Sequence, residues 1–190
     1  MLGVVLAGLA AAVSLLSLPP SIRPTPIGAG PRYQPPAASA AVAGGEPVAG
    51  LRCTRAPVRR FGVHLELFAR RRVVIVPAGI GVARPFARAF GRLSPRGCSY
   101  PLRTLEPTGV VEVAAGSRLT LGALFRLWGQ PLGPHRLASF RSRAPLLAFV
   151  GGRRWRGDAR SIPLTRHAQI VLELGGYVPP HPRYAFTGGL

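Results

Sequence analysis

The stretch that decides the fold begins with His64-Leu65-Glu66-Leu67-Phe68 and continues to Val73-Val74-Ile75-Val76. In the first segment apolar and polar residues alternate, which is the pattern of a strand with one buried face. The second segment is a β-branched run of the kind enriched in strands. Because Ala69 to Arg72 between them is turn-like, the two segments predict a β-hairpin.

Segments further along the chain predict a second hairpin and one helix. Tyr100 to Thr104 and Gly109 to Val113 are expected to pair across Glu106-Pro107-Thr108. Thr120 to Trp128 predicts a helix, with Thr120 as a plausible N-cap and Gly129 as a stop. Its apolar residues recur at helical spacing, namely Leu121, Leu124, Phe125 and Trp128.

Two more strands complete the predicted domain. Leu146 to Val150 ends at Gly151-Gly152, a dipeptide that suits a tight hairpin turn, and Gln169 to Leu174 follows. The order of elements predicts an α+β fold: a mostly antiparallel or mixed sheet with one packed helix, loosely β-grasp-like.

The chain divides into four parts by composition. Residues 1–18 form an uncharged apolar run, which predicts a signal or membrane anchor, and 19–50 are a Pro/Ala/Gly-rich linker. Residues 51–175 are expected to form a single α+β domain, and 176–190 a Pro-rich extended tail. We therefore expect a membrane-anchored protein with its domain outside the cytoplasm, or a secreted one if the leader is cleaved.

The charge of the chain is strongly positive. Lys and Arg together number 25 against 6 acidic residues, giving a formal net charge of +19. The chain contains Arg but no Lys or Asn, so a GC-rich genome can supply much of this charge. Two interpretations stay open: a dispersed solvated basic surface, or a selected attraction to an anionic surface.

The chain has 2 cysteines, Cys53 and Cys98. Neither has a second cysteine at the spacing of a structural zinc site. In an exported chain such a pair predicts one disulfide, although two buried, reduced thiols are the alternative.

No motif specifies a reaction, so we expect no enzyme and no cofactor. The 4 histidines form no helical metal-binding pair, and the His64 and Glu66 face alone is a weak site for any transition metal. No nucleophile elbow or glycine-rich phosphate loop is present. The chain has the positive charge that nucleic-acid binding requires, but it has neither aromatic residues interleaved with basic ones nor a zinc finger. The apolar leader also argues against nucleic acid as a partner.

A basic pattern lies within residues 84–96. Arg84, Arg88, Arg92 and Arg96 recur every four residues, and Phe86, Phe90 and Leu93 are expected on the opposite side. The spacing predicts a short amphipathic helix. Arg84, Arg88 and Arg92 are then candidate contacts to an anionic membrane surface, while the alternative places the aromatic side in the domain core.

Several stretches between residues 51 and 190 resemble an uncharacterised family of exported or membrane-anchored bacterial proteins. The stretches are Cys53, His64-Leu65, Val76-Pro77-Ala78-Gly79-Ile80-Gly81, Cys98 with Leu102 and Thr104, Thr108-Gly109-Val110-Val111, Thr120-Leu121-Gly122 through Phe125, Trp128 and Gly129, Gly157-Asp158, and Leu164 with His167 and Ile170. The resemblance implies a metal site, because such relatives carry Leu-His-Thr-His-Asp and Gly-Ile-Ile-His-x-Glu stretches and alternating histidines.

This chain departs from that pattern at the metal-binding positions. Only His64 is kept, and the other histidine positions are occupied by Gly62, Arg103, Leu105 and Glu112. The resemblance therefore implies a degenerate member that keeps the scaffold and has lost most of the metal site. We expect a non-enzymatic envelope binding or interaction module whose partners are the membrane, anionic lipid or an envelope protein. The alternatives are a metal-binding envelope protein and a basic membrane-surface or polyanion-binding domain.

Overall fold

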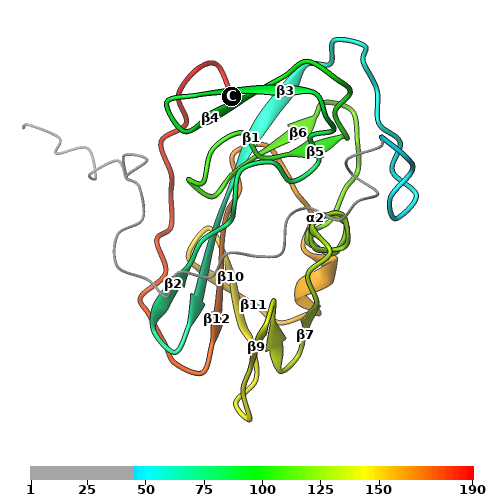
Figure 1. Cartoon of the computed structure of the whole chain (residues 1–190). Coiled ribbons are helices and arrows are strands. Elements are labelled where there is room, and N and C mark those ends of the chain that lie inside the picture. Colours follow the sequence, from blue (N-terminus) through cyan, green and yellow to red (C-terminus); the bar gives the residue numbers. More distant parts are fainter. Residues whose placement is uncertain (1–44) are drawn as a thin grey trace, which may run out of the picture.

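The computed structural model describes residues 45–190 (Figure 1). The predicted anchor, residues 1–18, and linker residues 19–44 lie outside that part. Within the described residues, no helix is long and apolar enough to cross a membrane.

The described residues contain mostly strands and one α-helix. The elements are β1 (Arg60–Ala69), β2 (Arg72–Val74), β3 (Phe86–Ala89), β4 (Arg92–Pro95), β5 (Leu102–Arg103), β6 (Val110–Ala114), α2 (Leu121–Trp128), β7 (Leu132–Gly133), β8 (Arg136–Leu137), β9 (Phe140–Arg141), β10 (Leu147–Val150), β11 (Arg153–Trp155), a 3₁₀ turn (Ala159–Ser161) and β12 (Gln169–Leu174). The predicted α+β class is therefore confirmed.

The main sheet has seven strands in the order β11-β10-β12-β1-β6-β5, with β2 also paired to β1. The central strands β1 and β12 are parallel, and the other pairs are antiparallel. The sheet is thus mixed, as predicted. The helix α2 lies between β6 and β10 in the chain and packs against one face of the sheet (Figure 1).

Alternate side chains of β1 build the hydrophobic core. Val63, Leu65 and Leu67 are almost completely buried, together with Ile170 and Leu172 of β12. From α2, seven of the eight residues are buried in the same core, which explains why this short helix is stable. It ends at Gly129, whose φ of 72° suits a left-handed C-cap.

The predicted hairpins and helix are found close to their expected places. β1 pairs with β2 through a turn at Arg70 and Arg71. β5 pairs with β6, and Gly151-Gly152 joins β10 to β11. The small meander β7-β8-β9, which the sequence did not predict, consists of two-residue strands too short to show a period.

The helix predicted within residues 84–96 is wrong. This segment is the β3–β4 hairpin, in which Phe86 pairs with Pro95 and Arg88 with Leu93. Phe90 and Gly91 form its turn at φ values of 49° and 79°. Such a left-handed pair matches the twist of a tight hairpin, so the glycine that weakens a helix favours this turn. Phe86 and Leu93 still face inward, in a small cluster with Val82 and Leu105.

Candidate functional site

The face of the sheet turned away from α2 carries the polar side chains. We call it the polar face; its residues are Arg60, Gly62, His64, Glu66, Arg103, Glu112 and Gln169. The register explains the gathering, because His64 pairs with Gln169, Gly62 with Glu112, and Arg103 with Glu112. Cross-strand partners point to the same side of a sheet.

Residues 176–190, which we call the C-terminal cover, form no helix or strand and contact the polar face. Tyr184 stacks on His64, with ring centroids 3.7 Å apart. Nδ1 of His181 lies 3.0 and 3.1 Å from the two carboxylate oxygens of Glu66. The aromatic and ionic partners are distant in the chain, so the sequence alone gave no signal for this contact.

Gly62 makes room for the cover. A Cβ atom at this position would lie 2.4 Å from Cδ1 of Phe186, far inside van der Waals contact. The Phe186 ring also stacks on His167 at 4.8 Å, and Nε2 of His167 lies 2.8 Å from the backbone oxygen of Leu190. The end of the cover is therefore held over the start of β1.

His64 is buried and hydrogen-bonded at both ring nitrogens. Nδ1 lies 2.7 Å from Oε1 of the Gln169 side chain, and Nε2 lies 3.0 Å from the carbonyl oxygen of Thr108. Burial lowers the pKa of His64, while Gln169 and Glu66 oppose this shift. Oε1 of Gln169 and the Thr108 carbonyl oxygen are both acceptors, so a neutral ring donates to only one of them unless the Gln169 amide is turned to present its NH₂ group.

At the other end of this face, Glu173 is fully buried. Burial raises the pKa of its carboxyl group, while the backbone N–H of Val178 and the charge of Arg154 oppose the shift. Its surroundings are apolar, since Phe68, Phe149 and Val171 form a cluster on this side, and the C-terminal cover adds Val178.

Beside His64 lies a pocket of about 400 Å³. Its charged lining residues are Arg60, Arg92, Arg103, Glu106 and Glu112. Nε and Nη2 of Arg103 each lie 2.7 Å from Oε2 of Glu112, and Arg92 pairs with Glu106. Nη2 of Arg92 also lies 3.6 Å from Oε1 of Glu112.

The arginines predicted to contact an anionic surface do not form one row. Arg84 lies over the Phe86 ring, with its guanidinium carbon 5.6 Å from the centroid, and Arg88 is exposed. Arg92 turns toward Glu106 and is already ion-paired. Phe90, by contrast, is fully exposed at the turn between them.

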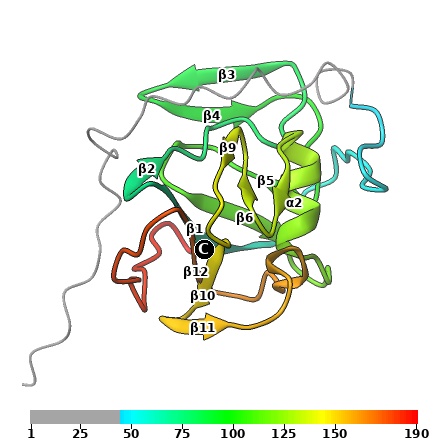
Figure 2. The ribbon, with the colours of Figure 1, turned by 90° about the horizontal axis from the view of Figure 1, so that it is seen from below.

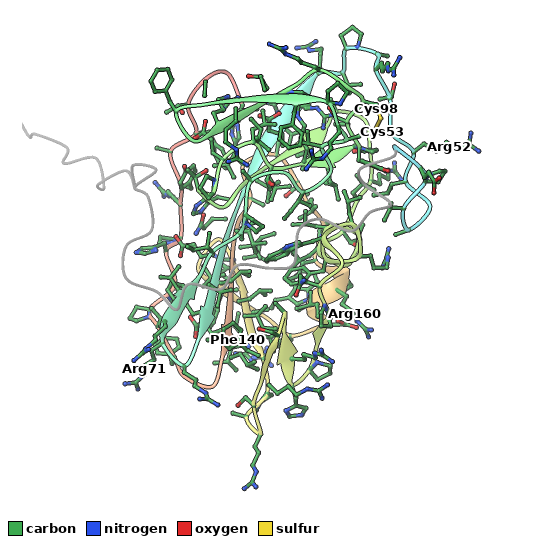
Figure 3. The ribbon with its side chains drawn as sticks, viewed as in Figure 1. Arg52, Cys53, Arg71, Cys98, Phe140 and Arg160 are labelled. Atoms are coloured by element: carbon green, nitrogen blue, oxygen red, sulfur yellow. A yellow bond between two sulfur atoms is a disulfide. The ribbon has the colours of Figure 1, made fainter. Side chains whose placement is uncertain are left out.

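The disulfide prediction is confirmed: Cys53 and Cys98 are bonded, with Cα atoms 5.4 Å apart (Figure 3). The bridge joins the segment before β1 to the segment after β4 and is close to Thr54 and Ser99, whose backbones also pair. The cysteines thus serve the scaffold, and among the described residues no free thiol exists.

Of the positions at which the resemblance places histidines, 62, 64, 103 and 112 lie on the polar face, whereas Leu105 packs in the cluster with Val82 and Leu93. The four positions on the polar face, however, hold an ion pair of Arg103 with Glu112, a glycine at 62, and His64. Within residues 45–190 no group of three or more His, Cys, Asp or Glu side chains could hold a metal ion. His135 is exposed and lies apart from this face, with Nδ1 3.3 Å from the carbonyl oxygen of Ala144.

Comparison of the chain with protein-family models, with curated proteins and with solved structures finds no match.

Proposed function

We propose that this protein is a non-enzymatic interaction module of the cell envelope, held by its N-terminal segment and applied to an anionic membrane surface through the β3–β4 hairpin. The observation that carries the proposal is Phe90. Its side chain is fully exposed, and its backbone lies in the left-handed region that bulky residues avoid. Folding gains nothing from a phenylalanine here, so contact with an apolar partner accounts for it better.

The surroundings of Phe90 supply the charge that such a contact needs. Arg84, Arg88 and Arg96 are exposed on the same hairpin or beside it. The β1–β2 turn carries Arg70, Arg71 and Arg72, all exposed. In Figure 1 both turns lie at the left, the β3–β4 turn near the top and the β1–β2 turn near the bottom, and α2 lies at the right. Figure 2 likewise shows β2 at the left and α2 at the right. An aromatic side chain flanked by arginines fits the interface of an anionic bilayer.

The polar face supports a binding role over an acid–base one. Three carboxylates on or beside this face have a basic side chain as partner: Glu112 has Arg103, Glu106 has Arg92, and Glu66 has the His181 ring. These groups hold the strands, the hairpin and the C-terminal cover together.

We also propose that the fold is β-grasp-like. This proposal is supported by the strand order β6-β1-β12-β10, with α2 joining the two halves.

Vesicle flotation tests the proposed contact. A chain beginning at Gly45, checked for its disulfide and a cooperative thermal transition, would be mixed with neutral or anionic vesicles at low salt. We expect binding to anionic vesicles only, and binding weaker by about ten- to a hundredfold for Phe90→Ser, because burying a phenylalanine contributes about 1.5–3 kcal/mol.

Two matched controls distinguish binding through the hairpin from nonspecific binding by any exposed aromatic residue or any exposed arginine. Tyr177→Ser removes the other exposed large aromatic residue of the described chain, and Arg126→Gln removes an exposed arginine on α2. Both variants should float like the parent, whereas Arg88→Gln should bind more weakly. Equal flotation of neutral and anionic vesicles, or no loss for Phe90→Ser, would refute the proposal.

A further inference from the structure

Among the side chains that line the pocket beside His64, arginines outnumber carboxylates by one. Its lining includes three arginines, Arg60, Arg92 and Arg103, and two glutamates, Glu106 and Glu112. Arg103 is bonded to Glu112 and Arg92 to Glu106. Arg60 is the remaining cation, and it forms no ion pair with any described residue.

Arg60 is fixed in place by backbone groups instead of by a carboxylate. Its Nη1 donates to the carbonyl oxygen of Pro101 at 3.1 Å, and its Nη2 donates to that of Tyr100 at 3.0 Å. These bonds orient the guanidinium, and the carboxylate whose charge acts on it, Glu112, is already bonded to Arg103. Burial and the neighbouring charge of Arg103 lower the pKa of Arg60 to about 10, while the charge of Glu112 opposes this shift. An anion at this place would relieve both effects.

The rest of the pocket is apolar or weakly polar. Val58, Leu105 and Val110 line it from the domain, and Tyr184 and Phe186 line it from the C-terminal cover. Burial and the charge of Glu106 raise the pKa of Tyr184, so its hydroxyl group stays protonated at neutral pH and can donate a hydrogen bond. A ligand here would contact the guanidinium group of Arg60 and the aromatic rings of Tyr184 and Phe186.

We propose that this pocket binds a small monoanion with an apolar body, a carboxylic acid of aromatic or aliphatic type, with its carboxylate on Arg60 and its apolar part against Tyr184 and Phe186. One negative charge balances the pocket, and a second would meet Glu106 and Glu112. The volume of about 400 Å³ lies within the range of small-molecule sites. This site does not involve the tip of the β3–β4 hairpin, so the proposal does not depend on the proposed membrane contact.

Saturation-transfer NMR with benzoate and benzamide tests the charge requirement. The two probes have nearly the same shape, and only benzoate is negative. The full chain would be held in nanodiscs of zwitterionic lipid, with empty nanodiscs subtracted. We expect saturation transfer to benzoate and none to benzamide at the same concentration. Equal signals from both probes, or no signal from either, would overturn the proposal.

Variants then locate the site. Arg60→Gln should weaken benzoate binding at least tenfold, whereas Arg59→Gln, the exposed neighbour outside the pocket lining, should bind like the parent. Val58→Glu places a competing carboxylate on the pocket wall outside any strand, and it should also abolish binding if Arg60→Gln fails to fold. Unchanged benzoate binding in a folded Arg60→Gln or Val58→Glu chain would refute the assignment.

Discussion

Replacing Gly62 with alanine tests whether the C-terminal cover is seated on the polar face. A Cβ atom at residue 62 would lie 2.4 and 2.6 Å from Cδ1 and Cε1 of Phe186. Because the ring sits on an extended segment, we expect it to leave, carrying the cover with it. The ring would lose its stacking on His167 and its edge contact with Tyr184, whose centroids lie 4.8 and 4.9 Å away.

The magnitude follows from those contacts. Each aromatic pair contributes about 0.5–1.5 kcal/mol, so Gly62→Ala should destabilise the domain by about 1–3 kcal/mol. The sign of this change in the free energy of unfolding is informative, because replacing glycine with alanine in a strand interior otherwise stabilises a protein by about 0.5–1 kcal/mol. Urea unfolding gives the free energy, and hydrogen exchange should show faster exchange of the amides from 184 to 190.

A second variant isolates the contact. In a Phe186→Ala background the steric conflict is gone, so adding Gly62→Ala should be neutral or stabilising. Gly133→Ala serves as the control, because a Cβ there meets nothing within 4 Å. If Gly62→Ala stabilised the parent protein and left exchange of the last residues unchanged, the cover would not lie where the structure places it.

Three further perturbations test the scaffold. The pair Cys53→Ser and Cys98→Ser opens a loop of 45 residues in sequence separation, which should lower the free energy of unfolding by about 4 kcal/mol; no loss beyond 1 kcal/mol would contradict this. Because the pKa of His64 is lowered in the folded state, the unfolded chain binds its proton more readily. Stability should therefore decline as pH falls below about 6.5, and His64→Gln should reduce this decline in urea titrations at several pH values. The raised pKa of Glu173 has the opposite sign, since stability is lost as pH rises above its unfolded value. Glu173→Gln should thus melt higher than the parent at pH 8 and equally at pH 4, and a lower melting temperature at pH 8 would count against a carboxylate destabilised by burial.

The sequence predicted the elements whose pattern is local. The alternation of residues 64–68 falls within β1 and the helical spacing of 121–128 coincides with α2, while only the first half of the β-branched run at 73–76 lies in a strand, β2. The disulfide also followed from local information, namely the count of cysteines in a chain with an apolar leader. In these cases burial of one face decides the structure, and the face can be read from spacing alone.

The segment around Phe90 shows where such reasoning fails. Its arginines and aromatics have a helical period over only a few residues, and a turn-favouring Phe90-Gly91 pair interrupts it. Inward packing of Phe86 and Leu93 is compatible with a strand pair as well as with a helix, so tertiary contacts decided the outcome.

The polar face depended on pairing that the sequence does not show. That His64 and Glu66 share a side was visible from alternation, but their partners Gln169, Tyr184 and His181 come from more than a hundred residues later. The parallel pairing of β1 with β12 brings them together. Likewise, the unpaired charge of Arg60 becomes visible only when the partners of Arg92 and Arg103 are known.

Depth-dependent fluorescence quenching tests the membrane contact most directly. Phe90→Trp places an indole at the tip of the β3–β4 hairpin, and the signal of the native Trp128 and Trp155 is subtracted using the parent chain. With the full chain reconstituted in vesicles containing brominated lipid, we predict added quenching in anionic vesicles and little in neutral ones. High salt should reduce it. No quenching above that of the parent in anionic vesicles would contradict a membrane-contacting hairpin.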